Sequence, residues 1–333
     1  MSSRFSTEQS LADKIKAEAS RLGFYRCGVA EAAPVGGKAA GEFARWIASG
    51  CHAGMDYMAH NTDKRLDPAL LMPGVRSIVC VSMAYAPPRT MPEGEYQIAA
   101  YALGRDYHDV MKARLRSLAA AMERLFAEAE AGKAASGLPA LAMRVFCDTA
   151  PVLERYWAWR AGLGWPGRNR QLVIPGAGSM FFLGEVFVNR SLPADSPQEP
   201  RCGTCRACID ACPTSAIADG GPLDARRCLS YLTIEHRGPL PAGVENVVGN
   251  SIYGCDRCQT ACPWNRLAPV ATAPELQPNA ALLAMTKAGW HNLSADDYRR
   301  LFKGNAVKRA KYEGLMRNIR AAEACGAGKK GQE

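Results

Sequence analysis

The sequence lacks the segments that would carry a chain into or across a membrane. Among its 333 residues no stretch approaches the roughly 18 uninterrupted apolar residues of a membrane-spanning helix. The start, MSSRFSTEQS, has neither the apolar core of a signal peptide nor a twin-arginine pair. We therefore expect a cytoplasmic protein that does not bind membranes.

The sequence also has no low-complexity tract, which argues against extended disorder outside the tails. With 48% hydrophobic and 22% charged residues, its composition is typical of a soluble globular protein. The length favours two or three domains. The formal net charge of +9 indicates either a polyanionic partner such as nucleic acid or merely a basic surface, and charge alone leaves both open.

Hydrophobic patterning predicts helices alternating with strands over roughly the first 190 residues. Helices are expected at 7–22, 106–131 and 151–162, and strands at 24–30, 77–84, 141–147, 172–174 and 180–189. This alternation argues for an α/β (α+β) domain. The segment 191–200 is rich in Pro, Ser and acids and is expected to be a linker.

Cysteine, in contrast, is abundant and clustered. A cytoplasm keeps thiols reduced, so the 13 cysteines are first of all candidate metal ligands. Cys202, Cys205, Cys208 and Cys212 form the run C-x2-C-x2-C-x3-C-P, in which three thiolates hold one 4Fe-4S cluster and the fourth reaches a second. Zinc, the alternative, has no use for the third cysteine of this run.

A second copy of the run is incomplete. Cys255, Cys258 and Cys262 repeat it, but Ile252 stands where its first cysteine belongs, and Cys228 is the natural substitute. Crossed ligation then gives two ligand sets. One cluster is predicted to bind Cys202, Cys205, Cys208 and Cys262, and the other Cys212, Cys228, Cys255 and Cys258. The remaining cysteines are assigned no role, because lone buried cysteines are usually small hydrophobes.

An electron carrier would not need the long segment that precedes Cys202, so we expect the electrons to be used within the chain. Here the sequence resembles the epoxyqueuosine reductase family, from about residue 12 to residue 320. The motifs that carry the resemblance are Lys64-Arg65, Gly104-Arg105-Asp106-Tyr107-His108, Cys147-Asp148-Thr149, Arg160-Ala161-Gly162-Leu163-Gly164-Trp165, Gly178-Ser179, Gly184-Glu185, Cys228-Leu229-Ser230-Tyr231-Leu232-Thr233 and Tyr253-Gly254-Cys255-Asp256.

The resemblance implies an oxidoreductase that binds base-off cobalamin in its first domain and reduces it through the two 4Fe-4S clusters. The enzyme would remove the epoxide oxygen of epoxyqueuosine and so leave queuosine at the wobble position of tRNAs with GUN anticodons. It also implies an external electron donor and a monomer. The predicted domains are a cobalamin and substrate domain at 1–190, a ferredoxin-like domain at 191–270 and a short helical, HEAT-like region at 271–333.

Asp148 matches the proton donor proposed for the family and is also expected to contact the cofactor. It follows an apolar strand, where partial burial would raise the pKa of its carboxyl toward working pH. The alternative is a structural one, in which Asp148 caps the helix expected near Pro151. Arg65 matches a cobalamin-contacting arginine, since a guanidinium suits propionamide carbonyls or a nucleotide phosphate; the alternative is a solvated turn residue.

The other predicted cofactor contacts are Arg168, Asn169, Ser179 and Ser230. Gly178 precedes Ser179 and would let the backbone approach a flat ring. Ser230 follows the ligand Cys228 and is expected between cluster and corrin, with packing as the competing explanation. Arg105 and His108 open a helix that faces tRNA or cofactor, or is simply an exposed polar helix start.

The chain departs from the family pattern in two places. Pro166 and Arg168 stand where an aliphatic residue and a lysine are expected, which leaves any contact there open to change. At the C-terminus, 304–324 resembles one unit of a helical repeat, and its basic residues either contact tRNA phosphates or form a solvated face. These residues are Lys303, Lys308, Arg309, Lys311, Arg317 and Arg320.

Two other functions remain as alternatives. A cobalamin-dependent reductive dehalogenase also joins a corrin domain to two clusters, but it usually carries an export signal that this sequence lacks. A non-enzymatic electron-transfer module would bind the clusters without a corrin.

Overall fold

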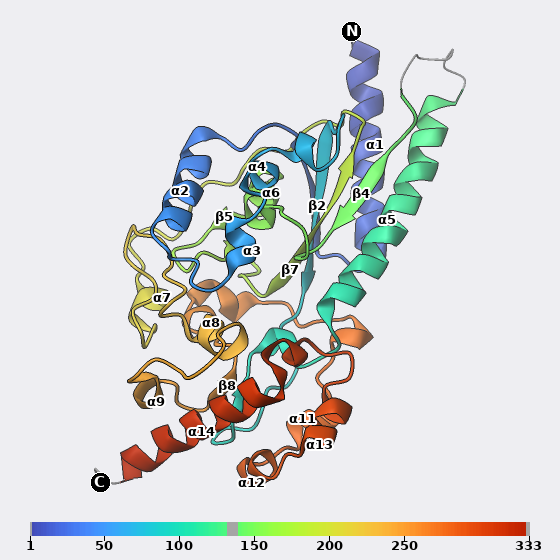
Figure 1. Ribbon diagram of the computed structural model, residues 1–333. Helices are drawn as coiled ribbons and strands as arrows, with labels where there is room; N and C mark the ends of the chain where they lie inside the picture. Colours follow the sequence, from blue (N-terminus) through green and yellow to red (C-terminus); the bar gives the residue numbers. More distant parts are fainter. Residues whose placement is uncertain (1, 132–138, 331–333) are drawn as a thin grey trace.

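A four-stranded sheet forms the centre of the computed structural model, which describes residues 2–131 and 139–330. Its strand order is β1-β2-β7-β4, and all three neighbouring pairs are antiparallel. The strands are β1 (Arg26–Glu31), β2 (Ser77–Ala84), β7 (Phe181–Val188) and β4 (Met143–Phe146) (Figure 1). These four strands were expected from the sequence, and the antiparallel pairing makes this part of the chain α+β.

Helices cover both faces of the sheet, which explains why the central strands are mostly apolar. The long helices α1 (Ser2–Arg21) and α5 (Tyr107–Glu130) pack on one face, where Val79 and Val186 meet Leu115. The short helix α6 (Glu154–Arg160) packs on the other face against Ile78 and Phe187. Because successive residues of a strand point to opposite faces, a strand covered on both sides has no polar alternation.

Three further helices lie on the α6 side of the sheet. They are α2 (Gly37–Ala48), α3 (Asp56–Ala59) and α4 (Thr62–Leu66) (Figure 1). Helix α6 begins at Glu154, three residues later than Pro151, where the sequence placed its start. After α6, strands β5 (Trp165–Pro166) and β6 (Leu172–Val173) form a separate two-stranded antiparallel ribbon.

The cysteine-rich part consists of short helices around a second small sheet. Strand β3 (Gln97–Ile98) pairs in parallel with β8 (Ser251–Tyr253), although more than 150 residues separate them. Around this pair lie α7 (Ala207–Asp210), α8 (Leu229–Ile234), α9 (Val244–Val247) and α10 (Arg257–Thr260). The pairing ties a segment preceding α5 to the cysteine-rich part.

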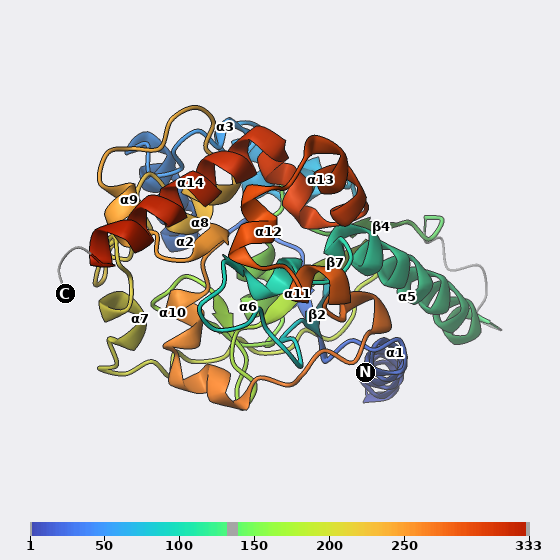
Figure 2. The same ribbon diagram turned by 90° about the horizontal axis from the view of Figure 1, so that it is seen from below.

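The C-terminal part packs back onto the cysteine-rich part. Its helices are α11 (Ala280–Leu283), α12 (Lys287–His291), α13 (Ala295–Leu301) and α14 (Lys311–Lys330). Helix α14 runs beside α8 and α9 (Figure 2), and its Leu315 and Ile319 share a core with Ile252 and Tyr96. The expected helical end is present, but as one long helix packed on this core; the likeness to a HEAT repeat is not confirmed.

Two polar residues fasten α14 to the cysteine-rich part. Asn318 is fully buried, and its amide donates to the carbonyl oxygens of Thr233 (2.8 Å) and Ile252 (2.9 Å). Arg317 donates to the carbonyl oxygens of Leu232, His236 and Gly238. None of the helices in residues 2–131 and 139–330 combines the length and the apolar character that crossing a membrane requires.

We expect Asn318→Ala to lower the free energy of unfolding by about 1–3 kcal/mol, since it leaves two buried carbonyl groups without a donor. Chemical denaturation followed by circular dichroism measures the change. Lys308→Ala, at an exposed position on the preceding turn, is the matched control and should change stability little. Equal stability of the two variants would show that Asn318 does not hold α14 in place.

Candidate active site and cluster ligands

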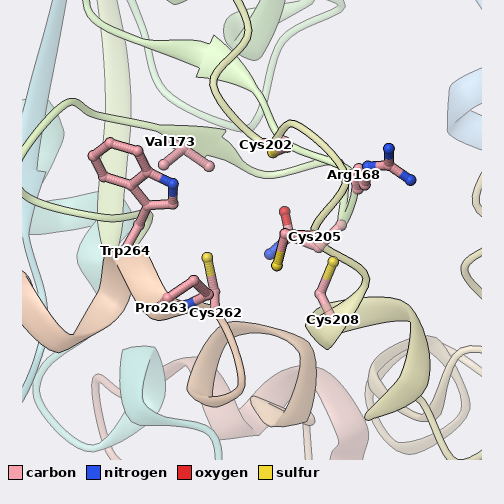
Figure 3. Close-up of a pocket in the computed structure, with 10 residues that line it drawn as sticks. Arg168, Val173, Cys202, Cys205, Cys208, Cys262, Pro263 and Trp264 are labelled. Carbon is pink, nitrogen blue, oxygen red and sulfur yellow. The ribbon is translucent and has the colours of Figure 1, made fainter.

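Four of the eight clustered cysteines line one cavity. They are Cys202, Cys205, Cys208 and Cys262, the set predicted for the first cluster, and they surround a common space beside Trp264 (Figure 3). The first three come from α7 and the loop before it, and Cys262 comes from the turn after α10. The Trp165 indole N–H donates to Cys202 Sγ at 3.5 Å. Four thiols converging on one cavity are a donor set that suits a 4Fe-4S cluster.

From the second cysteine on, the two cysteine runs have the same pattern of secondary structure, at an offset of 50 residues. Helix α7 corresponds to α10, and Ala211 N–H donates to the carbonyl oxygen of Ala207 as Ala261 N–H does to that of Arg257, both at 3.0 Å. Ile252, at the position of the missing cysteine, is fully buried in β8. The second run therefore keeps the fold of the motif and uses its first position for packing.

The other predicted set also lies close together. Cys228 directly precedes α8. Burial raises the pKa of its thiol, hydrogen bonds from the backbone N–H groups of Tyr231 and Ser230 lower it, and the nearby charge of Cys212 raises it. Burial followed by the charges of Cys255 and Cys228 raises the pKa of Cys258. The charge of Cys208, a member of the first set, also raises the pKa of Cys258, so these effects place the thiols near one another without separating the two sets. Assignment of Cys212, Cys228, Cys255 and Cys258 to the second cluster remains a prediction that this proximity supports.

Asp148 lies at the centre of a hydrogen-bonded group at the end of β4. Its backbone has a positive φ of 57°, and its Oδ2 accepts hydrogen bonds from the Tyr107 hydroxyl and from His108 Nε2 at 3.1 Å. Its own backbone N–H donates to Glu154 Oε1. The capping alternative is wrong, because α6 begins at Glu154 and its capping position is Leu153.

The electrostatics of Asp148 differ from the expectation. Burial raises the pKa of its carboxyl, but hydrogen bonds from His108 and Tyr107 outweigh burial and lower it. Burial lowers the pKa of His108, yet its hydrogen bonds to Asp106 and Asp148 raise that pKa to about 9. The Nδ1 of His108 is 2.7 Å from Asp106 Oδ1. At neutral pH the proton therefore resides on His108, within reach of Asp148.

Arg65 lies close to this group, on α4. It is 7% exposed, and one terminal nitrogen donates to the Tyr57 carbonyl oxygen at 2.8 Å. Burial lowers the pKa of Arg65, while the charges of Asp148 and Glu154 oppose this change. Its Nε is buried without a hydrogen-bond partner in the described part of the chain. A buried, unpartnered donor beside Asp148 fits an acceptor group of a bound molecule.

The remaining predicted contacts lie nearer the clusters. Asn169 is buried and donates to the Cys258 carbonyl oxygen at 3.4 Å. The Arg168 guanidinium points away from the four cysteines (Figure 3) and bonds Asp219 and the Gly203 carbonyl oxygen.

Ser179 lies beside the turn after Cys262, where its backbone N–H donates to Asn265 Oδ1 at 2.6 Å. A Cβ on Gly178 would lie 2.1 Å from the same side-chain oxygen and 2.9 Å from the Trp264 carbonyl oxygen, so this close approach explains the glycine without a ring. Ser230 is half-buried on α8.

Sequence reasoning gave no role to four residues that the structure brings into these sites. Tyr107 and Glu154 bond Asp148, Trp165 bonds Cys202, and Glu185 is a fully buried acid on β7. Tyr107, Trp165 and Glu185 belong to motifs that the sequence shares with the epoxyqueuosine reductase family, and those motifs could have pointed to them. No sequence signal pointed to Glu154, because only the turn after β4 brings its carboxyl to the backbone N–H of Asp148.

Comparison with known proteins agrees with this arrangement. Residues 65–149 match the family model described as "Epoxyqueuosine reductase QueG, DUF1730", and residues 201–265 match that of the "4Fe-4S double cluster binding domain". The epoxyqueuosine reductase of Cellulophaga algicola is 39% identical over 94% of this chain and 98% of its own length. This chain belongs to the epoxyqueuosine reductase family.

Other members give the same result. The epoxyqueuosine reductase of Pseudomonas aeruginosa is 40% identical over 93% of this chain and 84% of its own length. A crystal structure of an epoxyqueuosine reductase with an epoxyqueuosine-modified tRNA-Tyr stem loop matches with a TM-score of 0.82 and 27% identity, over 96% of this chain and 82% of that one. The Bacillus subtilis enzyme, described with an aspartate-bearing catalytic loop swung out of the active site, has a TM-score of 0.83, with the same identity and coverage.

Family membership settles part of the expected chemistry. The members are oxidoreductases, and the double-cluster domain binds two 4Fe-4S clusters. This excludes zinc as the metal of the cysteine-rich part. It also favours an enzyme over a simple electron carrier or a dehalogenase.

Replacement of Cys228 tests the second ligand set. Cys228→Ala should leave about half of the bound iron after anaerobic reconstitution, because one of two clusters loses a ligand. Iron and sulfide analysis with electron paramagnetic resonance of the reduced protein measures this. Cys325→Ala, at a buried cysteine outside both runs, is the control and should keep full iron. Full iron and unchanged spectra in Cys228→Ala would contradict the assignment.

The histidine in the Asp148 group predicts a pH-dependent stability. The pKa of His108 is about 9 in the folded protein and 6.5 in the unfolded chain. Its protonated ring therefore adds to the free energy of unfolding in full below pH 6.5, and this stabilisation is lost as the pH rises to about 9. Unfolding measured across this range should show a smaller loss of stability in His108→Gln than in the wild type. Burial raises the pKa of Glu154 to about 8, so its titration changes the stability of both proteins over the same pH range. The effect of His108 is therefore read from the difference between the two curves of stability against pH. Parallel curves would contradict the ion-pair interpretation.

Proposed function

We propose that this protein is an epoxyqueuosine reductase that removes the epoxide oxygen of epoxyqueuosine in tRNA and leaves queuosine at the wobble position. The observation that carries the proposal is the similarity to the epoxyqueuosine reductase of Cellulophaga algicola over 94% of this chain and 98% of that protein. The hydrogen-bonded Asp148 supports it, since opening an epoxide leaves a basic oxygen that needs a proton.

The residues present fit both cofactors. The cysteine sets described above would hold the two clusters. Arg65, with its unpartnered Nε, is the best supported of the predicted cobalamin contacts, which also include Asp148, Asn169, Ser179 and Ser230. Arg168 would have to release Asp219 before contacting a cofactor. When bound, cobalamin supplies strongly reducing electrons that no amino-acid side chain can provide.

Within the protein, Asp148 is placed to pass protons to the substrate. His108 holds a proton at neutral pH, and its Nε2 lies 3.1 Å from Asp148 Oδ2. As the C–O bond of the epoxide breaks, the proton held by His108 would pass through the Asp148 carboxylate to the departing oxygen. Asp106 and Tyr107 hold His108 and Asp148 in position.

The proposed partners are a tRNA with a GUN anticodon and an external electron donor, in a cytoplasmic monomer. Of the basic residues at the C-terminus, Lys303, Lys308, Lys311 and Arg320 are exposed and available to phosphates. Arg309 is paired with Glu235, and Arg317 binds backbone carbonyl groups. We therefore assign tRNA contact to the exposed four and a structural role to the other two.

The test is anaerobic reconstitution with iron, sulfide and cobalamin, then reduction and incubation with tRNA that carries epoxyqueuosine. Mass spectrometry of the nucleosides should show loss of one oxygen, dependent on cobalamin. An unchanged nucleoside with both cofactors bound would contradict the proposed substrate. Failure to bind cobalamin would instead support the electron-carrier alternative.

Asp148→Asn should lower kcat by about 10²–10⁴-fold, the usual contribution of a positioned proton donor. Cluster content and cobalamin binding, followed by absorption spectroscopy, should stay at wild-type levels, because no metal ligand is removed and asparagine keeps the size and one carbonyl oxygen of the Asp148 contact. Asp109→Asn, on the exposed side of α5, is the control and should keep full turnover. Loss of cobalamin binding in Asp148→Asn would make Asp148 a binding residue.

A further inference from the structure

A tryptophan contacts one of the ligands predicted for the first cluster. Trp165 is fully buried in β5, and its indole N–H donates to Cys202 Sγ at 3.5 Å. In the described part of the chain this sulfur is the one acceptor within hydrogen-bond distance of the indole N–H. A buried indole N–H normally has a partner, and here the partner is a cluster ligand.

The ribbon of β5 and β6 fixes the indole beside the cavity of the four cysteines. Trp165 pairs with Val173, which lines that cavity (Figure 3). Cross-strand partners share a face of a ribbon, so the two side chains lie together. A Cβ on Gly164 would lie 2.2 Å from the Val173 carbonyl oxygen, which shows how closely the strands approach. The tight ribbon leaves the indole little freedom to move away from Cys202.

Both chain segments that supply the ligands also hold the indole ring. Trp264, two residues after Cys262, meets the Trp165 ring edge-on, with centroids 4.9 Å apart and planes at 76°. The guanidinium carbon of Arg201, the residue before Cys202, lies 5.9 Å from the centre of the Trp165 ring. Edge-to-face aromatic pairs and cation–π contacts are both favourable. The contact with Cys202 is therefore fixed from two sides.

Other donors to the cluster cysteines are of a different kind. The Ala216 backbone N–H donates to Cys212 Sγ of the second set at 3.3 Å, and the Thr214 hydroxyl lies 3.6 Å from the same sulfur. Within residues 2–131 and 139–330, Trp165 is the only residue whose side-chain N–H donates to any of the eight sulfurs. Phenylalanine would fill the same space without this donor, so packing alone does not require an indole at position 165.

A hydrogen bond to a ligand sulfur favours the reduced form of a cluster. In the loaded protein, Cys202 is a thiolate bound to iron, and reduction adds negative charge to the cluster and its sulfurs. An N–H donor stabilises the more negative state, as hydrogen bonds to charged acceptors generally do. Hydrogen bonds to the sulfurs are among the factors that set the reduction potential of an iron–sulfur cluster.

We propose that Trp165 raises the reduction potential of the first cluster and so favours uptake of an electron from the external donor. One electron passes from a low-potential one-electron carrier, which is oxidised, to the cluster, which is reduced. No bond forms or breaks, and no proton moves. The role of this step in turnover rests on the proposed function, whereas the potential depends only on the bound clusters.

Redox titration of the cluster-reconstituted protein without tRNA, followed by electron paramagnetic resonance, tests the proposal. Trp165→Phe keeps an aromatic ring and removes the N–H. It should lower one of the two midpoint potentials by about 59 mV, a tenfold change in a one-electron equilibrium, which is the size expected of one hydrogen bond to a charged acceptor. The other potential should not change.

Trp290→Phe is the matched control. Trp290 is also fully buried, but its indole N–H has no partner in the described part of the chain. This variant should keep both wild-type potentials, and iron and sulfide analysis should show full clusters in both variants. The same shift in Trp290→Phe, or equal shifts of both potentials in Trp165→Phe, would overturn the proposal by showing a general effect of packing.

A second measurement needs no change at position 165, in case Trp165→Phe fails to assemble its clusters. Trp264→Phe removes the other indole beside the cavity, and growth on tryptophan labelled with ¹⁵N in the indole marks Trp165. Electron–nuclear double resonance of the reduced protein should detect one coupled indole nitrogen and its exchangeable proton. Absence of this coupling would overturn the contact between Trp165 and the cluster ligand.

The outcomes separate this inference from the proposed function. Wild-type potentials in a fully loaded Trp165→Phe would overturn the role of Trp165, while reduction of epoxyqueuosine by the wild type would still stand. A lowered potential in Trp165→Phe, together with a wild type that leaves epoxyqueuosine unchanged, would support the role of Trp165 and show that the assigned substrate is wrong.

Discussion

The antiparallel pairing of β2 with β7 is the interaction on which the rest of the structure depends. The two strands pair over eight residues, from Ser77 opposite Val188 to Ala84 opposite Phe181. Both are buried on both faces, so a shift in their register would move apolar side chains out of two cores at once. Their pairing places α5 on one side and α6 on the other, and it fixes β4 at the edge of β7. Asp148, two residues beyond β4, is therefore held between the starts of both helices.

That position explains the chemistry of the site. The start of α5 supplies Tyr107 and His108, and the start of α6 supplies Glu154. The exposed side of the group carries His108 between Asp106 and Asp148, while burial raises the pKa of the Glu154 and Glu185 carboxyl groups. This difference follows from solvation, since charges are stable near water and carboxyl groups retain protons where water is excluded.

The cysteine-rich part depends on contacts between distant segments of the chain. One cavity takes cysteines from both runs, and β8 pairs with β3 from the first hundred residues. The C-terminal helix α14 closes the same core, with Asn318 bridging Thr233 and Ile252. The cluster ligands are thus held by the fold as a whole, which places them beside the sheet that carries Asp148.

The sequence by itself determined much of this protein. Apolar runs predicted all four strands of the main sheet, because strands buried on both faces have a strong local signature, and cysteine spacing predicted the clusters because ligand geometry demands it. Family motifs pointed to Asp148 and Arg65. The tertiary structure alone decided how Asp148 ionises, because its partners Tyr107 and His108 lie 41 and 40 residues away in the sequence. It also decided that Glu185 has no partner and that α14 is part of a shared core, since burial and hydrogen bonding are properties of the packed chain.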